Sequence, residues 1–229
     1  MNNTDGAMRR FGQGPLSQVV ALVYTLLLVE LLLLVTALPG VVGLFLLERD
    51  SSNVPLAALC AIPFGPALSA AIYALHRHRG DLTELHPAAA FWRGYRLNAG
   101  GVLRLWVPWL ALLTVVGISL VNFSAAGVPI WWRGLLILIA VASTLWIANA
   151  LMITSLFSFR ARDIARLAVF FLLTRWRVTL GNAGLVLVAA AVTYLSSELV
   201  LGLLGSVFLL VMLATCLPMI ETVRKDFTQ

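Results

Sequence analysis

The chain has 229 residues, of which 61% are hydrophobic and only 11% are charged, and 16 Lys and Arg against 10 Asp and Glu give it a formal net charge of +6. Soluble domains carry about 25% charged residues, so this composition excludes a soluble globular domain and predicts an integral membrane protein. In a membrane protein, excess cations reflect topology and anionic lipid. We therefore expect lipid contacts and no nucleic-acid partner.

Apolar stretches of roughly 20 residues, long enough to cross a bilayer, occur six times. We predict a disordered cytoplasmic tail at 1–15, a single transmembrane domain at 16–221 and a second cytoplasmic tail at 222–229. Pro39 and Gly40 are expected to end the first span, and a polar turn at 196–198 to separate the last two. The fold class predicted is an all-α, polytopic transmembrane helix bundle, with spans at about 19–38, 54–75, 103–121, 134–157, 178–195 and 199–220.

The distribution of cations predicts the sidedness of the loops. With six spans and both termini inside, fourteen of the sixteen Lys and Arg residues lie on the inner side, and only Arg49 and Arg133 lie outside. Cytoplasmic loops carry such an excess of cations. Merging the last two spans would move Arg224 and Lys225 outside, so we prefer six spans, N-in and C-in. Anionic lipid of the inner leaflet is then an expected partner.

Two basic intervals, 75–104 and 159–181, each hold five Arg residues between apolar spans. Each begins near an acidic residue and continues with an apolar and aromatic run at near-helical spacing, followed by paired Arg and an Asn. We therefore predict a short amphipathic helix in each cytoplasmic loop, here called an elbow helix, and a parallel repeat of two hairpins.

The aligned residues of the two elbows are candidates for a lipid or partner interface, although they could equally set only the topology and depth of the loops. Asp81 aligns with Asp163, and Phe91 and Trp92 align with Phe170 and Phe171. The interface candidates are Phe91, Trp92, Arg93, Arg96 and Asn98 in the first interval, and Arg175, Arg177 and Asn182 in the second.

Glu30 is the most informative polar residue within an apolar span. A carboxylate near the middle of a bilayer costs on the order of 2.5 to 3.5 kcal/mol on insertion scales, so we expect Glu30 to face the bundle interior. It could bind a proton, a cation or a sugar hydroxyl. Alternatively, it could form a structural hydrogen bond with Asn149, Thr144 or Ser143 of the fourth span.

Pro63, Gly65 and Pro66 are predicted to interrupt the second span. Proline removes a backbone donor, and a broken helix frees carbonyl groups inside the membrane. Such breaks line the binding sites of transporters, but Pro and Gly also form passive kinks in ordinary spans.

Chemical motifs are sparse. His76, His78 and His86 lie among arginines that would repel a cation, and Cys60 and Cys216 lie in separate apolar segments, so we expect neither a metal site nor a disulfide. The sequence contains no HExxH, GxSxG or Walker motif. We accordingly expect no catalytic residues, no cofactor and no enzyme activity.

The run GPALSAAIYAL at 65–75, the run FWRGYRLN at 91–98 and the Leu38–Pro39 pair resemble the YesL-like family of bacterial membrane proteins, which is classed as a domain of unknown function. Glu30 departs from that pattern, in which Asn is frequent, and 40–60 resembles an insertion. The resemblance implies a bacterial cytoplasmic membrane location and a link to carbohydrate ABC importers, beside whose genes the family is often encoded. It carries over no catalytic residue.

Two classes of function follow. In the first, the protein is a non-catalytic accessory or regulatory component that docks against carbohydrate ABC importer subunits through its spans or elbow helices. In the second, it is a permease-like solute transporter with a site near Glu30, the Pro63–Pro66 break and Asn149. A water-filled cavity lined by Glu30 distinguishes them, because transport requires one and docking does not.

Overall fold

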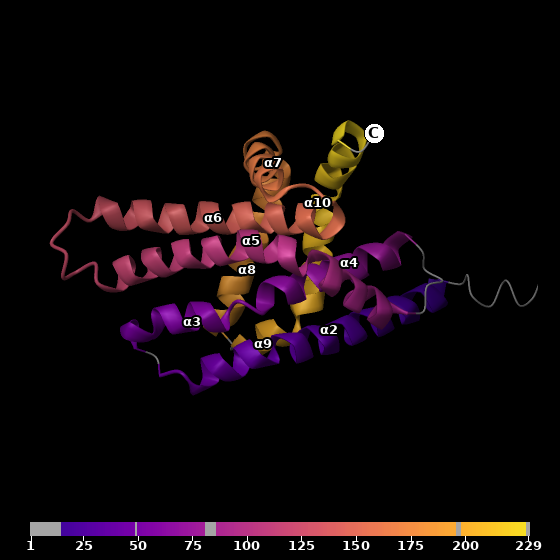
Figure 1. Ribbon diagram of the computed structural model, residues 1–229, viewed down its shortest axis with the longest axis horizontal. Coiled ribbons are helices and arrows are strands. Elements are labelled where there is room, and N and C mark those ends of the chain that lie inside the picture. Colours follow the sequence, from indigo (N-terminus) through magenta and orange to yellow (C-terminus); the bar gives the residue numbers. More distant parts are fainter. Residues whose placement is uncertain (1–14, 49, 81–85, 196–197, 228–229) are drawn as a thin grey trace, which may run out of the picture.

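The computed structural model describes residues 15–48, 50–80, 86–195 and 198–227, and within these ranges the chain is helical without any strand (Figure 1). A 3-10 turn at Ser51–Asn53 precedes α3. The helices are α2 (Pro15–Leu46), α3 (Val54–Cys60), α4 (Phe64–Gly80), α5 (Pro87–Val121), α6 (Trp131–Leu156), α7 (Ala161–Thr174), α8 (Trp176–Leu195), α9 (Glu198–Leu203) and α10 (Gly205–Phe227).

Among the described residues, six helical stretches are long and apolar enough to cross a membrane, which confirms the predicted six-span helical bundle. They are Gln18–Leu46, Val54–His78, Pro87–Val121, Trp131–Leu156, Trp176–Leu195 and Gly205–Lys225. Large apolar side chains such as Leu46, Leu138 and Leu187 are more than 60% exposed on them. Lipid is the solvent that accepts such surfaces, and the protein is a multi-pass integral membrane protein.

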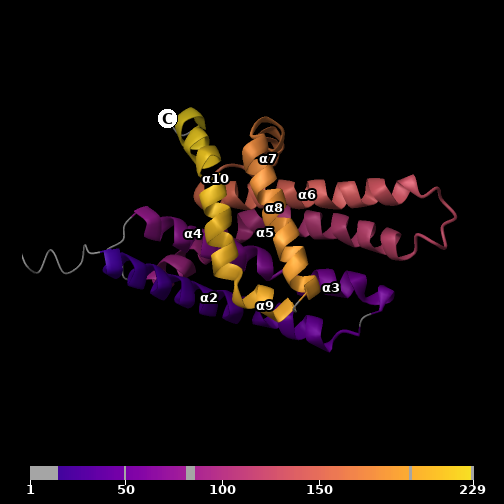
Figure 2. The same ribbon diagram turned by 180° about the vertical axis from the view of Figure 1, so that it is seen from behind.

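The first four spans form an antiparallel bundle made of α2, the α3–α4 pair, α5 and α6. Figures 1 and 2 show these helices running along the long axis of the molecule, with the turns between them at its two ends. The pairing of α2 with α4 has contacts at both ends, since Thr25 approaches His78 and Gly40 packs against Phe64. Asn98 of α5 likewise reaches Ser155 near the end of α6.

The last two spans, α8 and α10, pair with each other and run across the four-helix bundle at a steep angle (Figures 1 and 2). Their antiparallel register is fixed by Gly181, which packs against Thr215, and by Arg175, whose Nη2 donates a hydrogen bond of 2.9 Å to Thr222 Oγ1. A glycine at such a crossing allows close approach of the two backbones.

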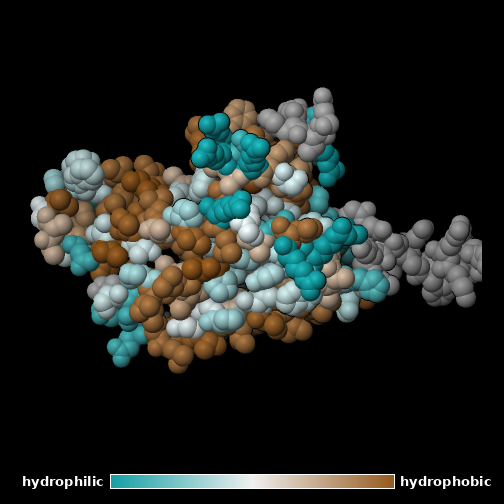
Figure 3. Space-filling view, in the orientation of Figure 1, coloured by the Kyte–Doolittle hydropathy of each residue, from teal (hydrophilic) through white to brown (hydrophobic). Residues whose placement is uncertain are grey.

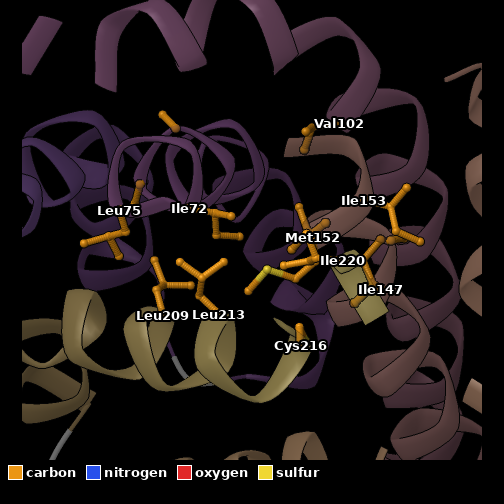
Figure 4. Packing of buried hydrophobic residues seen from close by; sticks show 14 of the residues in the cluster. Ile72, Leu75, Val102, Ile147, Met152, Ile153, Leu209, Leu213, Cys216 and Ile220 are labelled. Atoms are coloured by element: carbon orange, nitrogen blue, oxygen red, sulfur yellow. The ribbon is translucent and has the colours of Figure 1, made fainter. Parts of the chain in front are cut away.

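The core lies where α10 crosses α4 and α6. Figure 4 shows side chains from these helices converging, together with Val102 of α5. The labelled residues are Ile72, Leu75, Val102, Ile147, Met152, Ile153, Leu209, Leu213, Cys216 and Ile220. This layer joins the α8–α10 pair to the first four spans.

The predicted end of the first span at Pro39 and Gly40 is wrong, because α2 continues through both residues to Leu46. Proline removes one helical hydrogen bond, yet unwinding the chain in an apolar environment would leave more backbone groups without partners. Gly40 also packs directly against the carbonyl of Cys60, so the last turns of α2 are held by α3.

The first elbow is not a helix of its own. From Pro87 the chain runs as one helix of 35 residues to Val121, although a separate elbow helix and a span from about residue 103 were predicted. At 1.5 Å per residue α5 is about 52 Å long, well beyond the roughly 30 Å of a hydrocarbon core. Its first turns therefore provide the polar, basic surface expected of an elbow. Residues 81–85 lie outside the described part.

The second elbow is confirmed as a separate helix, α7, which packs on α6. The two basic intervals therefore differ in structure, one extending a span and the other forming a connecting helix. The last span begins at Gly205 and not at 199, because the short helix α9 comes first, and α10 continues to Phe227 into the predicted tail. Positions 1–14, 49, 196–197 and 228–229 lie outside the described residues.

Candidate functional site

Glu30 is buried between α2 and the start of α10, with 8% of its surface exposed. Its Oε2 accepts a hydrogen bond of 2.5 Å from the backbone N–H of Ser206, and a Cβ added to Gly205 would lie 3.4 Å from Oε1. The first N–H groups of a helix lack intrahelical partners, and a carboxylate there also interacts favourably with the helix dipole. Glu30 thus caps α10.

The expected partners of Glu30 on the fourth span are not used. The hydroxyl groups of Ser143 and Thr144 both donate to the carbonyl of Ala140, one turn back on α6. Asn149 instead contacts α8. Ser206 could not be identified as the partner from the sequence, because the donor is a backbone N–H that almost any residue would offer.

Asn149 belongs to a buried polar cluster that links three spans. Asn182 Nδ2 of α8 donates to Asn149 Oδ1 of α6 at 3.2 Å and lies 3.5 Å from Cys216 Sγ of α10. All three side chains are at most 2% exposed, and Asn149 Nδ2 has no hydrogen-bond partner among the described residues. The cluster is a structural tie between helices, and Asn182 is not part of a surface.

The interruption of the second span is confirmed at residues 61–63, between α3 and α4, and it is filled by a side chain. Trp106 Nε1 of α5 donates to the carbonyl of Ala61 at 3.0 Å, and the same carbonyl accepts a turn hydrogen bond from the N–H of Phe64. A Cβ on Gly65 would lie 2.6 Å from Trp106 Cγ, so the indole ring lies directly on this glycine. The carbonyl exposed by the break is thereby used within the protein.

Glu30 and the break do not form one site. The break packs against Gly40 of α2, which lies ten residues beyond Glu30. Ten residues of helix span about 15 Å. The combined site near Glu30, Pro63, Gly65 and Pro66 that the sequence suggested is therefore divided between two separate packing contacts.

The first-interval interface candidates separate into exposed and buried residues. Trp92, Arg93 and Arg96 are exposed on the first turns of α5. Phe91, in contrast, is completely buried, and Asn98 Nδ2 donates to the carbonyl of Ser155 at 3.0 Å. The helical repeat explains this division, because Phe91 and Asn98 lie two turns apart on the face turned toward the bundle.

The second interval also presents cations and aromatic residues on the surface. Arg175 and Arg177 are exposed, and the Arg177 guanidinium lies 5.6 Å from the centre of the Trp176 ring. In α7, Phe171 is buried and Phe170 is 53% exposed, the reverse of the order in the aligned pair Phe91 and Trp92. The sequence alignment of the two intervals is thus out of phase by one position.

A tryptophan of α6 fixes α7 to the bundle. Trp146 Nε1 donates to the carbonyl of Ala165 at 3.1 Å, and Ile164 and Phe171 are buried beneath the helix. The other side of α7 leaves Val169 and Leu173 exposed beside arginines. This arrangement suits a helix at a membrane interface.

On the face that Figure 3 shows, the hydrophilic surface lies in separate groups. In Figure 3 hydrophilic side chains gather at the top, over α7, and toward the right, over the ends of α4 and α5, with a smaller group at the lower left near the turn before α3. Hydrophobic surface covers the α5–α6 hairpin and follows α2 along the lower edge. The group over the ends of α4 and α5 coincides with the first basic interval, which the sequence predicts to be cytoplasmic.

No family model, curated protein or solved structure matches this chain. The motifs behind the YesL-like resemblance, 65–75 and 91–98, pack against each other as parts of α4 and α5. A Cβ on Gly94 would lie 2.8 Å from Tyr73 Cβ, and Ala70, Ala71 and Ile72 are completely buried. These motifs therefore have a clear role in helix packing.

Proposed function

We propose that this protein is a non-catalytic accessory or regulatory component of a bacterial cytoplasmic membrane, which docks against the membrane subunits of a carbohydrate ABC importer. The observation that carries the proposal is the environment of Glu30, whose carboxylate caps α10 and is packed against Gly205 and Ser206. A transport site would require this carboxylate to face a solute. Glu30, the candidate for a solute site, instead holds α2 and α10 together.

The first turns of α5 provide the surface for docking. Trp92, Arg93 and Arg96 are exposed there, while the opposite side of the same turns is held by Phe91 and Gly94 in the bundle. An exposed Trp beside Arg is the composition enriched at protein interfaces. Because the supporting side is rigidly packed, these side chains are presented without further ordering of the backbone.

The class of partner comes from the resemblance in 65–75 and 91–98 to the YesL-like family, which implies proximity to carbohydrate importers. Anionic lipid is the second partner, since exposed arginines lie on α5, α7 and α8 within the two basic intervals predicted to be cytoplasmic. Neither partner requires a cofactor or a catalytic group.

Affinity purification in mild detergent tests the docking role. The tagged protein is purified from its native membranes, and the bound proteins are identified by mass spectrometry. Trp92→Ala is expected to lose the importer subunits at least in large part, whereas Trp132→Ala is expected to retain them, because both residues are 42% exposed but Trp132 lies at the other end of the molecule. Equal recovery from both variants would contradict docking through α5.

One observation favours the permease alternative. Glu30 Oε1 is buried without a hydrogen-bond partner among the described residues, and so is Asn149 Nδ2. Uptake of labelled sugars into cells that carry Glu30→Gln separates the two functions. The accessory role predicts unchanged partner recovery and uptake close to that of the unaltered protein. Loss of uptake with normal partner recovery would instead support a permease.

A further inference from the structure

A small hollow lies between the end of α4 and the beginning of α5. It is lined by Ala74, Arg77, His78, His86, Pro87 and Ala90. The lining contains a guanidinium and two imidazole groups, and none of these described lining residues is acidic. The hollow lies at the end of the bundle predicted to be cytoplasmic.

The N-terminus of α5 opens at this hollow. Pro87 is the first residue of this 35-residue helix, the preceding His86 makes no side-chain capping hydrogen bond, and the first turn contains no acidic residue. A helix start presents unpaired N–H groups and a partial positive charge, and both favour an anion. Pro87 has no N–H and the N–H of Ala90 donates to the carbonyl of His86, so the helix contributes to the hollow its partial positive charge, which no carboxylate of the first turn offsets.

His78 supplies an independent observation. This side chain is 6% exposed and lines the hollow, and its Nε2 is buried without a hydrogen-bond partner among the described residues. Its Nδ1 lies 3.4 Å from Thr25 Oγ1 of α2, a contact that orients the ring. A buried polar nitrogen without a partner lowers the stability of the fold unless a ligand or a water molecule forms a hydrogen bond with it.

We propose that this hollow binds a phosphate group. The oxygens of a phosphate accept hydrogen bonds from the guanidinium of Arg77 and from the imidazoles of His78 and His86, which line the hollow, and the helix start adds a favourable partial positive charge. A metal cation would be repelled by the guanidinium and by the helix dipole. The phosphate comes either from the headgroup of an anionic lipid or from a soluble phosphate, and the hollow faces the leaflet where anionic lipid is expected. The proposal does not depend on docking to an importer.

The test measures retention of one phosphate-bearing ligand by native mass spectrometry. The complete protein is placed in nanodiscs of phosphatidylcholine doped with phosphatidylglycerol, and the number of retained phosphatidylglycerol molecules is counted after release. The double variant Arg77→Gln/His86→Gln changes only partly exposed or exposed residues at the rim and leaves the buried His78 in place. Binding is expected to fall by roughly fivefold, as loss of one cation near a phosphate implies.

Arg104→Gln is the matched control, because Arg104 is exposed farther along the same helix and its replacement removes the same charge outside the hollow. A second arm titrates inorganic phosphate into the protein in a zwitterionic detergent and follows phosphorus-31 line broadening. Retention of phosphatidylglycerol that only the double variant loses assigns the site to a lipid headgroup. Broadening of inorganic phosphate that only the double variant loses, without lipid retention, assigns it to soluble phosphate. If neither probe binds, or if Arg104→Gln is as harmful as the double variant, the proposal is overturned.

Discussion

At the scale of single residues, Glu30 is the polar group on which the junction between the first and last spans depends. Glu30 joins α2 to α10 across a sequence separation of 176 residues. Its carboxylate accepts a hydrogen bond from the Ser206 N–H, which has no partner within the helix. A buried N–H without an acceptor costs about 1 to 3 kcal/mol. The contact therefore stabilises the fold because it provides the Ser206 N–H with an acceptor.

Replacement of Glu30 by Ala and by Gln separates capping from charge. Glu30→Ala leaves the Ser206 N–H without an acceptor, and we expect it to lower the free energy of unfolding by about 1 to 3 kcal/mol. Glu30→Gln retains a carbonyl oxygen at the same position, so its loss should stay below about 1 kcal/mol. Unfolding in detergent measures the free-energy change of each variant, and Glu48→Gln, at an exposed position, is the control. Equal losses for Ala and Gln would show that capping by an oxygen is not what Glu30 provides.

The Asn149–Asn182 pair allows a direct measurement of a polar contact within the membrane region. Each residue is replaced by Ala alone and both together, and the coupling energy is taken from the double-mutant cycle. Hydrogen bonds between membrane helices average about 0.6 kcal/mol and reach about 1.7 kcal/mol, so we expect a favourable coupling within this range. A coupling indistinguishable from zero would mean that the 3.2 Å contact does not hold α8 against α6.

The buried role of these residues could be predicted only in part from the sequence. A carboxylate in an apolar span must face the interior, and this was correctly deduced for Glu30. Its partner could not be identified, because a backbone N–H at the start of α10 leaves no mark in the sequence. The position of Phe91 before two arginines, and of Asn182 after two others, predicts a surface location for both. Helical periodicity instead places both side chains toward the bundle, where they are buried.

At the scale of helices, α5 combines a membrane span and a basic surface in one element. Its first turns are held against α4 by Gly94, which packs on Tyr73, and its middle by Trp106, which fills the break before α4. The sequence showed six apolar stretches but not this continuity, because Gly100 and Gly101 have low intrinsic helix propensity. Packing on both sides of the glycines keeps the helix intact. The predicted end of the first span at Pro39 is the same kind of error, because packing of Gly40 against Cys60 holds the last turns of α2.

Two glycine substitutions in α5 test this packing. A Cβ on Gly94 would lie 2.8 Å from Tyr73 Cβ, whereas a Cβ on Gly100 meets nothing within 4 Å. We expect Gly94→Ala to destabilise the protein by about 1 to 3 kcal/mol through overpacking. Gly100→Ala should be neutral or stabilise it by up to about 1 kcal/mol, because alanine is the better helix former. Unfolding in detergent gives both values, and a similar loss for the two variants would refute close packing at Gly94.

At the scale of the whole molecule, the hydrophilic surface and the helix arrangement are linked. On the face drawn in Figure 3, one hydrophilic group lies toward the right, at the end of the four-helix bundle, and another lies at the top, over α7. The two groups point in different directions because the α8–α10 pair crosses the bundle steeply, and this crossing could not be predicted because it depends on contacts of α10 with α4 and α6. The docking surface and the phosphate hollow both require that the two basic intervals face the cytoplasm.

Cysteine accessibility in intact cells tests that requirement most directly. In a background with Cys60 and Cys216 replaced by Ala, a single cysteine is introduced at the exposed Thr174, at the end of α7, or at the exposed Ala125, in the turn between α5 and α6. A membrane-impermeant maleimide should label Ala125→Cys in intact cells and Thr174→Cys only after permeabilisation. Labelling of Thr174→Cys in intact cells would contradict the assigned topology and, with it, a cytoplasmic basic face.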